Sequence, residues 1–134
     1  MKFLLGAFLV GHALVHLSYL SPAPPRTADG PEWPFEMTQS WLVTGAGFDP
    51  ALVRALGTAT VLATVTLFVA AGLSTVGWLV PSEWWSGLVA AGAVASAMTL
   101  VIFFHPWIVL GLAIDAALLC ATLVIDWSPA TASP

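Results

Sequence analysis

Four long runs of hydrophobic residues divide the chain, and one polar stretch separates the first run from the second. The runs cover about residues 3–20, 52–80, 84–104 and 107–126, and the polar stretch covers residues 21–51. A helix needs roughly 20 apolar residues to cross the ~30 Å hydrocarbon layer of a bilayer. Each run therefore predicts one membrane-spanning helix.

The boundary between the third and fourth runs depends on the tripeptide HPW at residues 105–107. A single helix over residues 84–126 would be about 64 Å long, which is twice the hydrocarbon thickness. The chain must reverse, and Pro106 suits the first position of a new helix, so we expect the third helix to end by Phe103. The predicted fold is all-α: an integral membrane antiparallel four-helix bundle that forms one domain over residues 1–134, with one long loop between helices 1 and 2.

The long loop falls into two parts. Its first half is rich in proline and cannot form a regular helix. The stretch 38–48 carries no charge and contains Trp41, Leu42 and Phe48, which have no role in a solvated linker. It predicts a short helix at the membrane interface, and we expect segment 38–49 to pack on the end of the bundle.

The N-terminal run also resembles a secretory signal, because Lys2 precedes an apolar stretch that ends in small residues and prolines. Its two histidines suit a bundle helix better, so we interpret it as the first span of a multi-pass protein of the bacterial inner (cytoplasmic) membrane. Four spans place both termini on one side. Lys2 favours the cytoplasm for the termini, whereas Arg26 and Arg54 favour it for the loop. Because an acidic, Pro-rich loop crosses readily, the prediction is that both termini are cytoplasmic.

The composition supports a lipid environment. Hydrophobic residues make up 59% of the chain and charged residues 7%, whereas soluble domains contain about 25% charged residues. The net charge is −4 with three Lys and Arg in total, which excludes a nucleic-acid partner because phosphate binding needs a basic surface. Cys120 is the single cysteine, so no intramolecular disulfide can form.

Polar side chains recur at one depth in the predicted spans. His12 lies eight residues from Leu20, and Asp115 lies eight residues from Trp107, so both are about 12 Å from the loop-side end of their span. Histidines nearer the loop are His16 and His105. The predicted polar mid-membrane layer consists of His12, Thr64, Ser96 and Asp115.

Asp115 is the residue of this layer that most needs a partner. An aspartate in hydrocarbon costs roughly 2.5–3.5 kcal/mol on insertion scales, so it should face the bundle interior. His12 is the best-placed partner. The pair then either fixes the register of two helices or belongs to a proton relay or a metal site.

The histidines raise the alternative of a bound cofactor. His12 and His16 are four residues apart and share one helix face, so they could ligate Zn, Cu or Fe, with Asp115 or His105 as a third ligand. A haem needs ligands from opposite sides, which His105 could provide together with one of the other two. The chain has no H-E-x-x-H motif and no cysteine pair. We therefore expect no cofactor and no catalytic residues, with haem or a divalent metal as the alternative.

Three stretches, "HALVHL", "SWLVTGAGFDPALVRALG" and "FFHPWIVLGLAIDAALL", together resemble a family of small four-span bacterial membrane proteins of the high-GC, actinobacterial type. The family has an H-x3-H first helix and an HPW…GLAID last helix. The resemblance implies the four-span fold and no activity. Its shared polar positions would be His12, His16, His105 and Asp115.

The leading functional hypothesis is a non-catalytic small integral membrane subunit that packs against a larger membrane complex, such as an energy-transducing one. The chain is short and has few charges, and its small residues and tryptophans favour lateral contact. The expected partners are the lipid bilayer and other membrane subunits or a second copy of the chain. Two alternatives are a small redox or metal- or haem-binding membrane protein that uses the histidines, and a transporter-like oligomer.

Overall fold

The computed structural model describes residues 2–25, 32–38 and 40–129, so Arg26 lies outside the described residues. These residues form helices and contain no strand. The long helices are α1 (Lys2–His16), α3 (Pro50–Thr75), α4 (Trp85–Ile102) and α5 (Val109–Leu119). The short elements are η1 (Leu17–Leu20), α2 (Trp41–Thr44), η2 (Ser82–Trp84), η3 (Pro106–Ile108) and one π-helical turn, η4 (Cys120–Val124).

Among the described residues, four helical stretches are long and apolar enough to cross a membrane: Lys2–Leu20, Pro50–Thr75, Ser82–Ile102 and Pro106–Val124. Their number agrees with the sequence prediction. The second stretch ends at Thr75 and not near residue 80, because Gly77 and Leu79 turn the chain with φ angles of 69° and 63°. Such left-handed residues end helices.

The reversal after α4 occurs at the predicted position. α4 ends at Ile102 with Phe103 as its C-cap, and η3 begins at Pro106. The side chain of His105 caps this new helix, because its Nδ1 accepts a hydrogen bond from the backbone N–H of Trp107 at 3.2 Å. His105 therefore has a local structural role.

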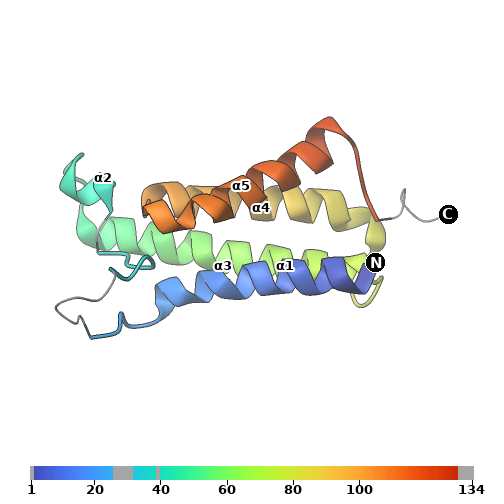
Figure 1. Cartoon of the computed structure of the whole chain (residues 1–134), viewed down its shortest axis with the longest axis horizontal. Coiled ribbons are helices and arrows are strands. Elements are labelled where there is room, and N and C mark those ends of the chain that lie inside the picture. The colour runs from blue at the N-terminus through green and yellow to red at the C-terminus, as the bar shows by residue number, and fades with distance from the viewer. Residues whose placement is uncertain (1, 26–31, 39, 130–134) are drawn as a thin grey trace.

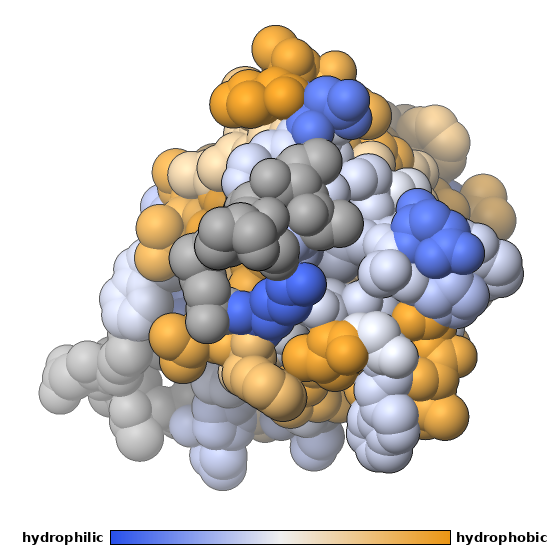
Figure 2. Space-filling model, turned by 90° about the vertical axis from the view of Figure 1, so that its right-hand side faces the viewer, coloured by the Kyte–Doolittle hydropathy of each residue, from blue (hydrophilic) through white to orange (hydrophobic). Residues whose placement is uncertain are grey.

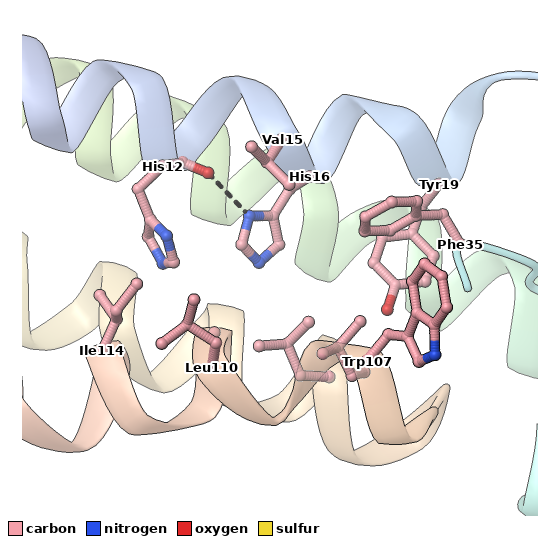
Figure 3. A pocket seen from close by; sticks show the side chains of 11 residues that line it. His12, Val15, His16, Tyr19, Phe35, Trp107, Leu110 and Ile114 are labelled. Carbon is pink, nitrogen blue, oxygen red and sulfur yellow. Dashed lines mark hydrogen bonds between the residues drawn. The ribbon is translucent and has the colours of Figure 1, made fainter. Parts of the chain in front are cut away.

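The long helices pack in the order α1, α3, α4, α5, each against the next (Figure 1). The backbones of α1 and α3 come closest at two glycines: a Cβ atom added at Gly6 or Gly72 would lie 3.0 Å from the carbonyl oxygen of the other. Small residues allow such close approach between helices. In the described part of the chain, α1 and α5 are not closely packed against each other, and side chains project into the space between them (Figure 3).

Two buried apolar clusters hold the bundle together. The first lies toward the α3–α4 turn and includes Leu9, Phe68 and Trp85. The second lies toward α2 and includes Tyr19, Val61 and Phe103. Several buried polar side chains lie between the two clusters along the helices, and the candidate site is built from them.

The end of the molecule that carries the α3–α4 turn exposes charged residues together with large apolar ones such as Trp78 and Leu79. Lys2, Glu83 and Asp126 are exposed there, close to the ends of their elements. Seen from this end, a few strongly hydrophilic residues lie among residues of intermediate hydropathy and apolar residues (Figure 2). Exposed tryptophans such as Trp78 and Trp84 beside charged residues are typical of the boundary between a bilayer and water.

The segment around α2 packs on the opposite end of the bundle. Ser40 is fully buried, caps α2 by accepting from Leu42 N at 3.2 Å, and donates to the carbonyl oxygen of Ile102 at 2.8 Å. The indole Nε1 of Trp41 donates to the carbonyl oxygen of Val101 at 2.7 Å. The expectation that this segment packs on the bundle is confirmed for Ser40, Trp41 and Leu42 by their contacts, although Trp41 and Phe48 are each 50% exposed.

Replacing Ser40 with alanine is expected to loosen this segment without unfolding the bundle. The change removes a cap and the donor to Ile102, which together cost about 1–2 kcal/mol. Amide hydrogen exchange over residues 41–44 should accelerate by one order of magnitude or more, while exchange within α3 stays slow. Thr38→Ala, which removes an exposed hydroxyl of the same loop, is the control, and equal acceleration in both variants would contradict the prediction.

Candidate functional site: a buried hydrogen-bonded network

Three helices contribute polar side chains to one buried network. α1 presents His12 and His16 from adjacent turns of one face, α4 presents Ser96 near its middle, and α5 presents Asp115. Ser96 is fully buried and Asp115 is 1% exposed. Asp115 is also the only carboxylic acid in the four candidate spans that lies more than one turn from the end of its span.

The four side chains form an unbroken chain of hydrogen bonds. His12 Nε2 lies 3.1 Å from Asp115 Oδ1, so the contact predicted from the depth of the two residues is present. The hydroxyl of Ser96 lies 2.5 Å from Asp115 Oδ2 and 2.9 Å from His16 Nε2. The other ring nitrogen of His16, Nδ1, lies 3.1 Å from the carbonyl oxygen of His12 (Figure 3). The chain of hydrogen bonds therefore begins at the side chain of His12 and ends at the backbone carbonyl oxygen of the same residue.

The number of hydrogens available restricts how this network can be protonated. His16 Nδ1 must carry a proton, because a carbonyl oxygen can only accept. Ser96 has one hydroxyl hydrogen and two hydrogen-bonding neighbours, Asp115 and His16. One neighbour must therefore donate to the serine oxygen while the other accepts from it.

Two arrangements without a net charge satisfy every contact. In the first, Asp115 is ionised and accepts from Ser96, and His16 is doubly protonated and donates to Ser96. In the second, Asp115 is protonated and donates to Ser96, and Ser96 donates to a neutral His16. With a neutral His12, both arrangements have no net charge, and they differ only in the position of two hydrogens. No heavy atom has to move for one to become the other.

Apolar side chains surround the imidazole of His12. Its ring centroid lies 5.2 Å from that of Phe68 and 6.2 Å from that of Phe8, and the ring of His16 lies 5.2 Å away. The low local dielectric strengthens hydrogen bonds and makes any unpaired polar group costly. Removing one member of the network therefore leaves its neighbours unpaired at a cost in stability.

The hydrogen-bonded network and the predicted polar layer differ in membership at two positions. Thr64 is fully buried, but its hydroxyl donates to the carbonyl oxygen of Thr60 in its own helix at 2.8 Å, so it does not join the network. His16, expected nearer the loop, is a full member. A separate polar link joins α3 to α4, where Thr99 Oγ1 donates to Thr60 Oγ1 at 2.8 Å.

The arrangement gives no support to the metal and haem alternatives. Among the described residues, no group of three or more His, Cys, Asp and Glu side chains could hold a metal ion. Both ring nitrogens of His16 are engaged in hydrogen bonds, and His105 caps η3 and is not part of the network. The structure brings His12, His16 and Asp115 together as hydrogen-bond partners.

Comparisons with known protein families, with curated proteins and with solved structures find no match to this chain. The family suggested by the H-x3-H and HPW motifs therefore stays a prediction. The function has to be inferred from the buried network itself.

Proposed function

We propose that the chain is a multi-pass membrane protein, an antiparallel four-helix bundle, in which Asp115, Ser96 and His16 form a proton relay at the middle of the bilayer and His12 orients the carboxyl group. The observation that carries this proposal is the position of the Ser96 hydroxyl between Asp115 and His16. The lengths and hydropathy of the four helices support the membrane location, and the cytoplasmic location of both termini stays a prediction from the charges.

The relay step needs no other reactant. The O–H bond of protonated Asp115 breaks as a new O–H bond forms on Ser96, and the original Ser96 hydrogen moves to Nε2 of His16. The result is a carboxylate and an imidazolium, and the reverse step restores the neutral side chains. Donor and acceptor are 2.5 Å and 2.9 Å from the serine oxygen, which is normal hydrogen-bonding distance.

A purely structural role explains the network less well. A pair that fixes helix register needs two residues, and His12 with Asp115 would suffice. Ser96 and His16 extend the pair to four buried polar side chains in a segment where each is costly to place. The extension leads from the carboxyl group to His16, whose ring also lines a cavity between α1 and α5. For a proton to pass from His16 to an occupant of the cavity, His16 Nδ1 would first have to release the carbonyl oxygen of His12.

The other functions expected from the sequence have no specific support in the geometry. The exposed apolar side chains of α5, such as Leu110, would be covered equally well by lipid or by a partner subunit, so the role of accessory subunit stays a prediction. A transporter-like path would have to pass the two apolar clusters on either side of the network.

Coupled titration in the reconstituted protein tests the relay. The carbonyl stretch of protonated Asp115 in infrared spectra and the 15N signals of His16 should change together with pH, because groups that share protons titrate as one system. Ser96→Ala is expected to make the two signals titrate independently, and Ser96→Thr, which keeps a hydroxyl, should restore the coupling.

Ser74→Ala provides the control for this experiment. Ser74 is also fully buried, but its hydroxyl donates to the carbonyl oxygen of Pro81 outside the network. This variant should titrate like the original protein. If Ser96→Ala also titrates like the original protein, with Asp115 and His16 still coupled, the relay is refuted.

A further inference from the structure

We propose that the cavity between α1 and α5 binds a neutral, lipid-soluble ring compound of the quinone type, whose oxygen accepts a hydrogen bond from Tyr19. This site goes beyond the relay: the proposal rests on the shape of the cavity and on Tyr19, and it would stand if the relay failed.

The cavity has the size of a substituted ring. It has a volume of about 230 Å³, and side chains of both α1 and α5 contribute to its walls (Figure 3). A cavity of about 150 Å³ in a protein core holds a benzene molecule. A six-membered ring with small substituents therefore fits, and a long apolar tail can leave through the open side.

Tyr19 provides an unused hydrogen-bond donor at this cavity. Its side chain lines the cavity and is 4% exposed, and its hydroxyl is buried without a hydrogen-bond partner among the described residues. The hydroxyl points toward α5, into the space between the two helices (Figure 3). A buried donor without an acceptor is costly. Because neighbouring side chains cover the hydroxyl, an oxygen of a bound ligand satisfies it only when a wall of the cavity moves aside.

The open side of the cavity is apolar, which indicates entry from the lipid. Val15, Trp107 and Leu110 line the cavity and are 52%, 68% and 71% exposed. The cavity walls also include the rings of Phe35 and Tyr19, which pack edge to face with centroids 5.3 Å apart. Aromatic walls favour a flat ring over a flexible chain.

The charge of the surroundings favours a neutral ligand. His12 and His16 line the cavity, and the carboxyl group of Asp115 lies directly behind them in the network. A fatty acid would bring a second carboxyl group into the same low-dielectric region, which is unfavourable. A lipid acyl chain would avoid this cost but would leave the Tyr19 hydroxyl unpaired. A ring that carries a carbonyl oxygen meets both requirements.

Ligand binding to the full chain in phosphatidylcholine nanodiscs tests this site, with decylubiquinone as the probe. We expect saturable binding that Tyr19→Phe weakens about tenfold, which is the typical effect of one hydrogen bond. The same substitution should leave the stability of the ligand-free protein unchanged or raise it, because it removes an unpaired buried hydroxyl. A purely structural tyrosine would show the opposite effect on stability.

A matched pair of variants tests the location. Val15→Trp should abolish binding by filling the cavity, whereas Leu14→Trp should not change it. Leu14 is the preceding residue of α1, has the same exposed fraction of 52%, and does not line the cavity. This pair gives a result even if Tyr19→Phe fails to fold.

Three outcomes would overturn the proposal. Equal affinity for decylbenzene, which lacks the ring oxygens, would show an unspecific apolar pocket, and competition by oleate at the same concentration would show a fatty-acid site. No saturable binding would show that the cavity takes no such ligand. None of these outcomes alters the titration of Asp115 and His16 measured without ligand, so failure of the binding site and failure of the relay can be distinguished.

Discussion

Replacing Asp115 with leucine is expected to lower the free energy of unfolding by about 3 kcal/mol, because a buried network that loses one charged or strongly polar member leaves its neighbours unpaired. His12 Nε2 would lose its acceptor, and Ser96 would lose one of its two partners. The loss can be measured by reversible unfolding with SDS in mixed micelles, followed by circular dichroism.

Asparagine at the same position should be tolerated much better, with a loss of about 1 kcal/mol or less. Its amide oxygen can accept from His12, and its NH₂ group can donate to Ser96, which then donates to His16. Asparagine thus reproduces the arrangement that contains a protonated Asp115. The protein should fold, but the infrared signal of the carboxyl group and its coupling to His16 should be absent.

The double variant His12→Leu with Asp115→Leu separates hydrogen bonding from packing. If the network only holds the helices together, the double variant should recover part of the loss seen in Asp115→Leu, because no imidazole is left without an acceptor. An equal loss of unfolding free energy in Asp115→Asn and Asp115→Leu would contradict the view that hydrogen bonding stabilises the site. It would show that the negative charge of Asp115 is what stabilises it.

The second large effect is expected at the contact between α1 and α3. Gly72→Ala should destabilise the bundle by about 1–3 kcal/mol, the usual cost of an extra methyl group in a tightly packed contact. A Cβ atom at this position would lie 2.9 Å from Val10 Cγ2 and 3.0 Å from the backbone carbonyl oxygen of Gly6. Val10 can rotate away, but the carbonyl of Gly6 moves only if the two helices separate.

Gly11→Ala is the matched control for this prediction. Gly11 lies in the middle of α1, and a Cβ atom there would meet nothing within 4 Å. Alanine stabilises a helix interior relative to glycine by about 0.5–1 kcal/mol, so this variant should be at least as stable as the original protein. The same unfolding experiment should therefore give changes of opposite sign, and a loss in both variants would show that the close contact is not the cause.

Counting residues along helices was sufficient to predict the contact between His12 and Asp115, because the rise per residue is constant. The same count placed His16 outside the layer, since its Cα lies about 6 Å nearer the loop than that of His12. Side chains on a helix tilt toward its N-terminus, so the ring of His16 leans back toward the layer and reaches Ser96. The direction of side chains, and not only their spacing, decides which groups meet.

Two other features could not be derived from hydropathy. Thr64 has the right depth, but a threonine hydroxyl in a helix can bond to its own backbone one turn earlier, which is what it does here. The second helix ends at Thr75 although the chain remains apolar to Val80. The helix ends there because Gly77 and Leu79 adopt left-handed backbone conformations. The mean hydropathy of a run of residues does not report backbone conformation.

The contact of α2 with the end of α4 has a consequence for how the proposed membrane bundle would form during synthesis. Ser40 and Trp41 donate to carbonyl oxygens that follow them by 62 and 60 residues. A ribosome therefore produces these donors long before their acceptors exist. If the proposed bundle inserts from its N-terminus, the segment around α2 reaches its acceptors only after α4 has been placed. The turn between α4 and α5 can then form against the α2 segment, which was synthesised earlier. The packing of the α2 segment therefore depends on the later placement of α4.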